Sequence, residues 1–233
     1  MSKRSITHLD QLLKFFLPFF VAFAGIALLY VYFVYIDDHI TFMKLLFLMS
    51  AYFVPPLGKE SIIPIGIAGG RLNLPFFTNS VYIPPITPLI MALSIAFVDI
   101  VVALFLVWNY DLAKKIPIVG KFISKVEKIG LKSSSKYSWI VPLRFIGIIL
   151  FVMVPFQGSG GLVGSIIGRL IGMKPLNIFA AISIGSIVGC TIIAYFADVL
   201  RYFLIKNFLQ ALLVILVIVI FILMVRVYIR NSR

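Results

Sequence analysis

The chain has 233 residues, of which 62% are hydrophobic and 12% are charged, and its formal net charge is +13. This composition excludes an intrinsically disordered chain and a water-soluble globular domain, and it is typical of an integral membrane protein. The apolar runs show no strand-like alternation, which also excludes an outer-membrane barrel. We therefore expect a single polytopic membrane domain over residues 1–233.

The N-terminal region is predicted to hold an interfacial helix followed by the first membrane span. Residues 7–14 place leucines on one helical face, which is typical of a helix lying along a membrane surface. Residues 15–36 carry no charge and are long enough to cross a hydrocarbon core of about 30 Å. The acidic pair Asp37 and Asp38 ends this span on the far side.

An interrupted apolar segment follows the first span. Residues 44–54 and 62–70 are apolar limbs, and residues 55–60 (PPLGKE) break the helix between them. A limb of a dozen residues reaches about 18 Å, which is too short to cross the membrane. The sequence therefore predicts a re-entrant hairpin, followed by a polar loop and a full span at residues 86–108.

A second interrupted segment lies in the other half of the chain. Its limbs at residues 143–154 and 162–172 flank a glycine-rich break at 155–161, where we expect glycines to supply positive φ angles. Irregular backbone at membrane depth is tolerated only inside protein or beside a wet cavity, so this turn predicts a site. Full spans are predicted at 177–197 and 208–225. The small residues Ala181, Gly185 and Gly189 repeat every four positions, which predicts close packing with a neighbouring helix.

Residues 111–138 form the longest polar stretch and are rich in lysine. Their apolar residues recur at intervals of three and four, which predicts an amphipathic helix on an anionic membrane surface. A solvated connector helix and a short coiled-coil contact remain alternatives.

The charge distribution predicts the topology. Four full spans place both termini on one side, and most lysines and arginines fall on that side, which is therefore the cytoplasm. The first hairpin then enters from outside and the second from inside. The predicted fold is an all-α membrane protein with an inverted repeat, in which residues 44–108 and 143–197 each form a re-entrant hairpin followed by a transmembrane helix. Such repeats are typical of secondary transporters.

Two motifs resemble a known family. Residues 154–165 (VPFQGSGGLVGS) resemble the P-x-P-G-T-G-x-x-x-G-S hairpin of the small multi-drug export protein family, distant relatives of the DedA-like membrane proteins. Glu60 ahead of residues 64–66 (PIG) resembles the acidic residue before I-P-x-G in the first hairpin of that family. The resemblance covers about residues 40–200 and implies a double-hairpin inverted repeat and membrane transport. Gln157 departs from the pattern because it replaces the second proline.

Two acidic residues are candidates for proton or ion coupling, because a charge inside the bilayer is costly and is retained for a reason. Glu60 falls at the first hairpin turn, where it is the preferred proton carrier; a helix cap or a pair with Lys59 is the structural alternative. Asp99 lies midway along a full span. Its alternatives are ion coupling and a structural pair with Arg144 or Arg169.

The predicted substrate-binding residues lie at the two turns or on their limbs. They are Lys59, Pro64, Arg144, Pro155, Gln157, Gly158, Ser159, Gly160 and Arg169. The positive helix N-termini at both turns, with Lys59 and the two arginines, predict an anionic amphipathic small molecule or a lipid phosphate as ligand. Arg144 and Arg169 can instead snorkel to the cytoplasmic interface.

The leading functional hypothesis is proton- or ion-coupled export of amphipathic small molecules through a midplane site in the cell membrane. A flippase or scramblase of phosphate-bearing lipids and a non-transporting membrane organiser are the alternatives. We expect no enzyme, because the sequence lacks a histidine cluster, metal-ligand spacing and a Ser–His pair near the turns. We likewise expect no catalytic residue, cofactor, metal or nucleic-acid partner, and we leave a homo-oligomer open.

Overall fold

The computed structural model of the chain describes residues 3–54, 57–72, 81–110, 143–155 and 159–206, with the single positions 115, 120, 124, 216 and 224. Apart from those single positions, the basic segment at 111–138 and the last predicted span at 208–225 lie outside the described residues. Gln157 and Gly158 also lie outside them.

The described part is mostly helical. Its elements are α1 (Lys3–Tyr35), α2 (His39–Ala51), α3 (Lys59–Ala68), β1 (Gly70–Leu72), β2 (Val81–Ile83), α4 (Pro88–Trp108), α7 (Arg144–Met153), α8 (Gly161–Leu170) and α9 (Pro175–Lys206). Three helices are long and apolar enough to cross a membrane, at Leu12–Tyr35, Pro88–Trp108 and Pro175–Phe203. They coincide with three of the four predicted spans. The interfacial segment at 7–14 is not a separate helix, because α1 runs through it without a break.

A short β ribbon departs from the all-α prediction. β1 and β2 pair antiparallel, with Arg71 opposite Tyr82, at one end of the predicted polar loop. The chain enters β1 through Gly69 and Gly70, whose φ angles of 66° and 109° favour glycine. Gly69 also lies against Pro85, because a Cβ atom added at Gly69 would come within 2.9 Å of the proline nitrogen. These glycines turn the chain back towards α4.

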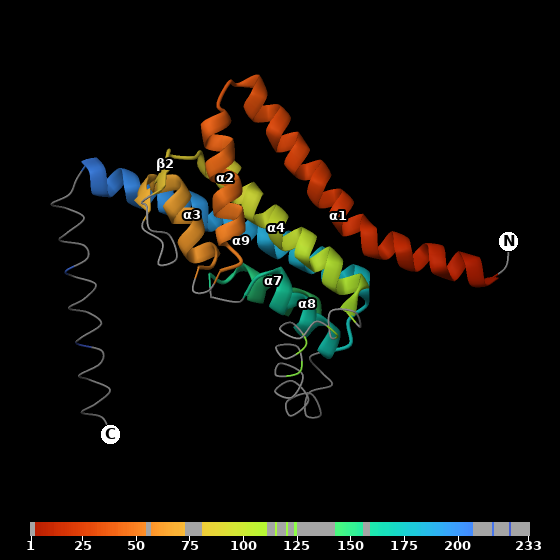
Figure 1. Ribbon diagram of the computed structural model, residues 1–233. Coiled ribbons are helices and arrows are strands. Elements are labelled where there is room, and N and C mark those ends of the chain that lie inside the picture. The colour runs from red at the N-terminus through yellow and green to blue at the C-terminus, as the bar shows by residue number, and fades with distance from the viewer. Residues whose placement is uncertain are drawn as a thin grey trace.

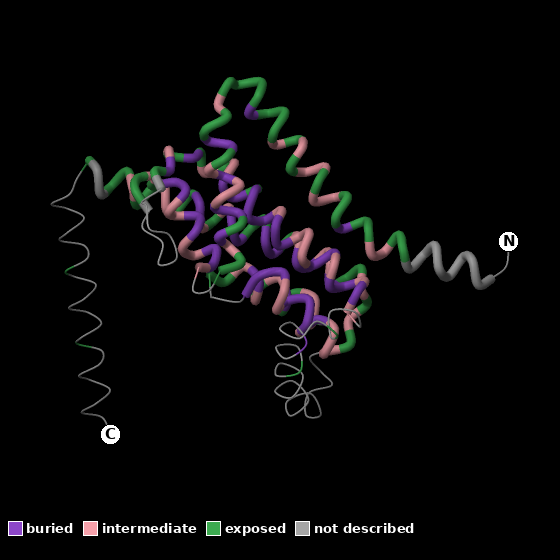
Figure 2. The backbone as a smooth tube through the Cα atoms, in the orientation of Figure 1, coloured by how far each residue is buried: buried purple, intermediate pink, exposed green. Residues whose placement is uncertain are grey.

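The bundle is organised around α4 and α9, which lie side by side (Figure 1). α1 crosses α4 on one side, α2 and α3 descend towards the middle of the bundle, and α7 and α8 lie beneath it (Figure 1). Burial follows this order: 61% of the apolar window in α4 is buried, against 6% in α1 (Figure 2). The interior is therefore built on α4, and α1 presents most of its apolar surface outward.

Two pairs of short helices occupy the predicted interrupted segments. α2 and α3 have 13 and 10 residues, and α7 and α8 have 10 each. None can cross a core of about 30 Å at 1.5 Å per residue. The first break ends earlier than predicted, since Lys59 and Glu60 already form the first turn of α3, where an acidic side chain favours the helix dipole. Their re-entrant course and the inverted relation of the two halves remain predictions.

Small residues on α9 allow α7 to pack closely, as their spacing predicted. A Cβ atom added at Gly185 would lie 2.7 Å from the backbone oxygen of Ile149, and one added at Gly189 would lie 2.8 Å from Cα of Met153. Both neighbours belong to the α7 backbone, so side chains at these positions would push the helices apart. The prediction of close packing is confirmed.

Candidate functional site

The middle of α4 carries a buried carboxylate with three hydrogen-bond donors. Asp99 is 2% exposed. Its Oδ1 accepts from the Tyr52 hydroxyl at 2.7 Å and from the Gly161 amide at 2.8 Å, and its Oδ2 accepts from the Ser186 hydroxyl at 2.7 Å. The three donors come from the ends of α2 and α8 and from the middle of α9. We call these four residues, with Lys59, the Asp99 centre.

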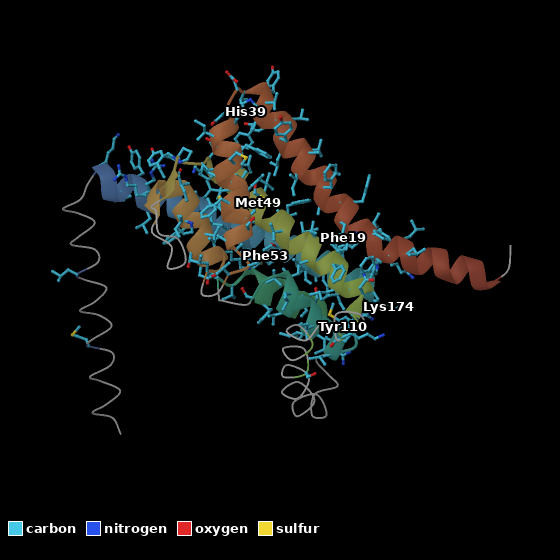
Figure 3. All side chains as sticks on the ribbon, viewed as in Figure 1. Phe19, His39, Met49, Phe53, Tyr110 and Lys174 are labelled. Atoms are coloured by element: carbon cyan, nitrogen blue, oxygen red, sulfur yellow. The ribbon has the colours of Figure 1, made fainter. Side chains whose placement is uncertain are left out.

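The centre forms because the two helix breaks meet at α4. Tyr52 is the C-cap residue of α2, and Gly161 is the first residue of α8. Figure 3 places Phe53, the neighbour of Tyr52 in the chain, at the end of α2 that faces the middle of α4. A helix start leaves its first amides without partners inside the helix, so the Gly161 N–H is available to a carboxylate. Asp99 therefore takes the role of an anion bound at the start of α8.

Gly160 and Gly161 are required because a side chain at either position would collide with its neighbours, and not because of a positive φ angle. A Cβ atom added at Gly160 would lie 2.4 Å from the Tyr52 hydroxyl, and one added at Gly161 would lie 2.1 Å from the backbone oxygen of Asp99. Gly160 has φ −77° and ψ −169°, a conformation open to any residue. The expectation of a positive φ is wrong for Gly160, while Gly158 lies outside the described residues.

Lys59 connects the first break to the second. Its side chain is 1% exposed, and its ammonium group donates to the backbone oxygen of Val152 in the last turn of α7. The last carbonyls of a helix lack partners inside the helix and carry partial negative charge, so a cation is favoured there. Ser159 supports the same helix end, because its hydroxyl donates to the backbone oxygen of Val154 at 2.6 Å.

Glu60 lies at the N-terminal turn of α3 and is half-buried. Its carboxylate folds over Gly58, where an added Cβ atom would lie 2.3 Å from Oε1. Its Oε2 is buried without a hydrogen-bond partner. The Tyr52 hydroxyl interacts electrostatically with both Asp99 and Glu60. The Lys59 ammonium group donates to the backbone oxygen of Val152. This bond does not support the alternative in which Lys59 pairs with Glu60.

The two predicted arginines lie away from the centre. Arg169 donates to the backbone oxygen of Val107 at 2.7 Å, and its guanidinium carbon is 5.7 Å from the ring centroid of Tyr110. Arg169 is about 12 Å along α8 from Gly161. Arg144 begins α7, and its Nη1 lies 3.6 Å from a Cβ atom added at Gly172.

This placement does not support the alternative in which Asp99 forms a structural pair with Arg144 or Arg169. Tyr110, whose ring lies beneath Arg169, is at the end of the bundle where α4 ends (Figure 3). The three hydrogen-bond donors at Asp99 are all neutral groups. Asp99 therefore depends on hydrogen bonds where the sequence allowed a salt bridge with an arginine.

The two predicted prolines are not among the residues that bind Asp99. Pro64 lies within α3, one turn after Glu60, and Pro155 is exposed after the end of α7. Sequence reasoning missed Tyr52, Gly161 and Ser186 as site residues, although Gly161 falls within the predicted glycine-rich break. Tyr52 had one available signal, its position beside the first break, whereas Ser186 looked like any small residue of a packed helix. Among the described residues, the structure has no cluster of three metal-ligating side chains.

Three long apolar helices, with a mostly apolar interior that holds the hydrogen-bonded Asp99 centre, define a polytopic membrane protein. The model of the family described as "Putative small multi-drug export protein" matches residues 61–192, more than half of the chain. The chain belongs to this family, and the resemblance seen in its sequence is confirmed. No curated protein and no solved structure matches the chain. The relation to DedA-like proteins remains a prediction.

The matched region contains part of the Asp99 centre. Asp99, Gly161 and Ser186 fall inside residues 61–192, whereas Tyr52 and Lys59 precede the matched region. The carboxylate and two of its three donors therefore lie within the segment that defines the family.

Proposed function

We propose that the protein is a proton-coupled exporter of amphipathic small molecules in the cell membrane, with both termini in the cytoplasm and the Asp99 centre at the membrane midplane. The observation that carries this proposal is the buried Asp99 carboxylate, bound by neutral donors from two helix breaks. An ionisable group inside a membrane protein is costly and is typical of proton pathways. Family membership supports export as the class of function.

The hydrogen-bond pattern determines which oxygen of Asp99 takes up the proton. Oδ1 accepts from the Gly161 amide, which can only donate, and from Tyr52. Oδ2 is bound by the Ser186 hydroxyl, which can accept as well as donate. A proton on Oδ2 therefore turns the Ser186 hydrogen away, towards Cys190 Sγ at 3.8 Å. Protonation changes the link between α4 and α9 and leaves the links to α2 and α8 in place.

This change in the hydrogen bond between α4 and α9 couples protonation of Asp99 to the arrangement of the helices. With Asp99 ionised, one carboxylate ties together α2, α4, α8 and α9. With Asp99 protonated, the α4–α9 link is weaker, so the proton shifts the population between two arrangements of the helices. Glu60 is a second carrier, since it has a buried oxygen without a hydrogen-bond partner and lies at the same helix break as Tyr52. We propose that protons reach Asp99 past Glu60.

The charge of the centre bears on the substrate. The positive N-terminal end of α8 is occupied by Asp99, and Glu60 occupies that of α3. Arg144 and Arg169 are elsewhere, so Lys59 is the one cation of the expected set that remains in the centre. This arrangement favours an amphipathic substrate without an obligatory negative charge. It weakens the case for a lipid-phosphate flippase, which relied on several cations around the turns.

The test is transport in proteoliposomes, with a pH gradient imposed across the membrane. Asp99→Asn keeps the size of the side chain and donates to Ser186, as the protonated carboxyl does, but cannot exchange a proton. Uptake of an amphipathic dye should respond to the gradient in the wild type and lose that response in the variant. Asp37→Asn is the matched control, because Asp37 is 97% exposed. A well-folded Asp99→Asn protein with gradient-dependent transport would overturn the proposal, as would gradient-independent movement of a phosphate-bearing lipid without dye transport.

A further inference from the structure

A cavity lies outside the Asp99 centre, between α1 and the N-terminal half of α4. Its volume is about 440 Å³, within the range of drug-sized ligand pockets. Its walls are apolar and are formed by Gly25, Leu29 and Tyr32 of α1 and by Leu89, Ile90, Leu93, Ser94 and Phe97 of α4. We call it the α1–α4 pocket. Its α1 wall belongs to the least buried of the three long helices, of which 6% of the apolar window is buried (Figure 2).

The wall of this pocket holds a buried hydroxyl group without a partner. Ser94 is 2% exposed, and its Oγ has no hydrogen-bond partner. Helical serines and threonines commonly donate to the carbonyl four residues earlier. Four other helical hydroxyls in this protein do so, at distances of 2.6 to 2.9 Å, namely those of Ser50, Ser165, Ser183 and Thr191. The Ser94 hydroxyl makes no such bond, and a buried unpaired polar group requires an explanation.

We propose that the α1–α4 pocket binds the apolar body of the exported molecule, with Ser94 as hydrogen-bonding partner for a single hydroxyl or carbonyl group on it. The inference rests on the proposed function for the identity of the ligand as substrate. A drug-sized apolar ligand with one polar group would occupy the cavity and satisfy the hydroxyl. A lipid acyl chain would fill the same space but would leave Ser94 unpaired.

The α1–α4 pocket adjoins another cavity at Phe97. Phe97 lines the α1–α4 pocket and also a second cavity of about 310 Å³. That second cavity is lined by Phe53 and Val98, the chain neighbours of Tyr52 and Asp99. Gly25 of α1 packs on the Phe97 ring, since an added Cβ atom would lie 2.1 Å from it. Phe97 therefore forms a wall that the two cavities share.

The experiment is photolabelling in lipid nanodiscs, without a pH gradient. The probe is a benzyl alcohol that carries a trifluoromethyl diazirine, and its analogue has a methyl group in place of the hydroxymethyl group. We expect the alcohol to label residues 89–97 of α4. Ser94→Ala should lower this labelling about two- to tenfold, the effect of one hydrogen bond, and should leave labelling by the methyl analogue unchanged. Ser183→Ala is the matched control, because the Ser183 hydroxyl is already bonded to Phe179.

Other outcomes separate this inference from the proposed function. Equal labelling of wild type and Ser94→Ala by the alcohol would overturn the inference, as would labelling by a diazirine acyl-chain lipid that the alcohol does not displace. Ser94→Ala removes an unpaired polar atom, so its melting temperature should be unchanged or higher, and a folding defect would not account for lost labelling. Asp99→Asn should keep full labelling while it loses gradient-driven transport. Retained transport in Asp99→Asn with Ser94-dependent labelling would overturn only the proposed function.

Discussion

The Tyr52 hydroxyl donates to Asp99 Oδ1 at 2.7 Å, across 47 positions of the chain. This bond attaches the end of α2, at the first helix break, to the middle of α4. The second break reaches the same oxygen through the Gly161 amide. One carboxylate oxygen thus holds both interrupted segments, so a change at Asp99 acts on both of them at once.

Tyr52→Phe should therefore weaken the protein and impair transport. The variant removes a hydrogen bond to a charged group, which is worth about 1.5–3 kcal/mol, and leaves the ring in place. We expect a lower melting temperature in detergent and a slower gradient-driven dye uptake. Tyr195→Phe serves as the control, because Tyr195 lies on α9 and is 50% exposed. Equal stability of Tyr52→Phe and wild type would show that the bond contributes nothing to the fold.

Gly161→Ala should be among the most damaging single-methyl substitutions in the described chain. The added Cβ atom would lie 2.1 Å from the backbone oxygen of Asp99, and a helix backbone cannot move aside as a flexible side chain can. We expect a loss of roughly 1–3 kcal/mol or more in unfolding free energy. Gly147→Ala on α7 is the counterpart, since a Cβ atom there meets nothing within 4 Å. That variant should gain about 0.5–1 kcal/mol from helix propensity, and thermal melts of both proteins check the contrast.

Acid should loosen the start of α2. Asp38 is the N-cap residue, and its carboxylate accepts from the Thr41 amide at 3.0 Å. The hydrogen bonds from Thr41 lower the pKa of Asp38 below its usual value. A carboxyl whose pKa is depressed on folding contributes stability above its unfolded pKa of about 3.9, and this contribution is lost as the pH falls through the folded value. The protection of the α2 amides, measured as their exchange rate relative to that of an unfolded peptide at the same pH, should fall as the pH is lowered from 5 to 3.

The control for this pH effect is Asp38→Asn. Asparagine is a good N-cap residue that does not titrate, so α2 should keep its protection across this pH range. The same acid-dependent loss of α2 amide protection in Asp38→Asn would show that another group is responsible.

The predicted topology leads to a labelling experiment. In a Cys190→Ser background, a membrane-impermeant thiol reagent should label Lys125→Cys only from the cytoplasmic side and Asn79→Cys only from outside. The lysine distribution and the two short-limbed segments give this expectation. Labelling of both positions from the same face would exclude the arrangement of four spans and two re-entrant hairpins.

The sequence by itself determined the class, three of the spans, the two interruptions and the family. Hydropathy and helix breaking are local properties: the apolar runs at Pro88–Trp108 and Pro175–Phe203 and the break at Pro55 and Pro56 carry their signals in adjacent residues. The close packing at Gly185 and Gly189 was predictable for the same reason, because a four-residue repeat places both on one helical face.

Tertiary structure alone decided the partners of Asp99. Its donors lie 47, 62 and 87 positions away in the chain, and no local pattern relates them to it. The sequence allowed Asp99 to pair with Arg169. However, the first residue of α8 binds Asp99, and Arg169 lies in the last turn of α8. Arg169 therefore contacts the C-terminal end of α4, at Val107. Packing likewise decided that Gly160 is required by the nearby Tyr52 hydroxyl and not by its φ angle. Such choices depend on which helix ends meet in space, and only the assembled bundle specifies that.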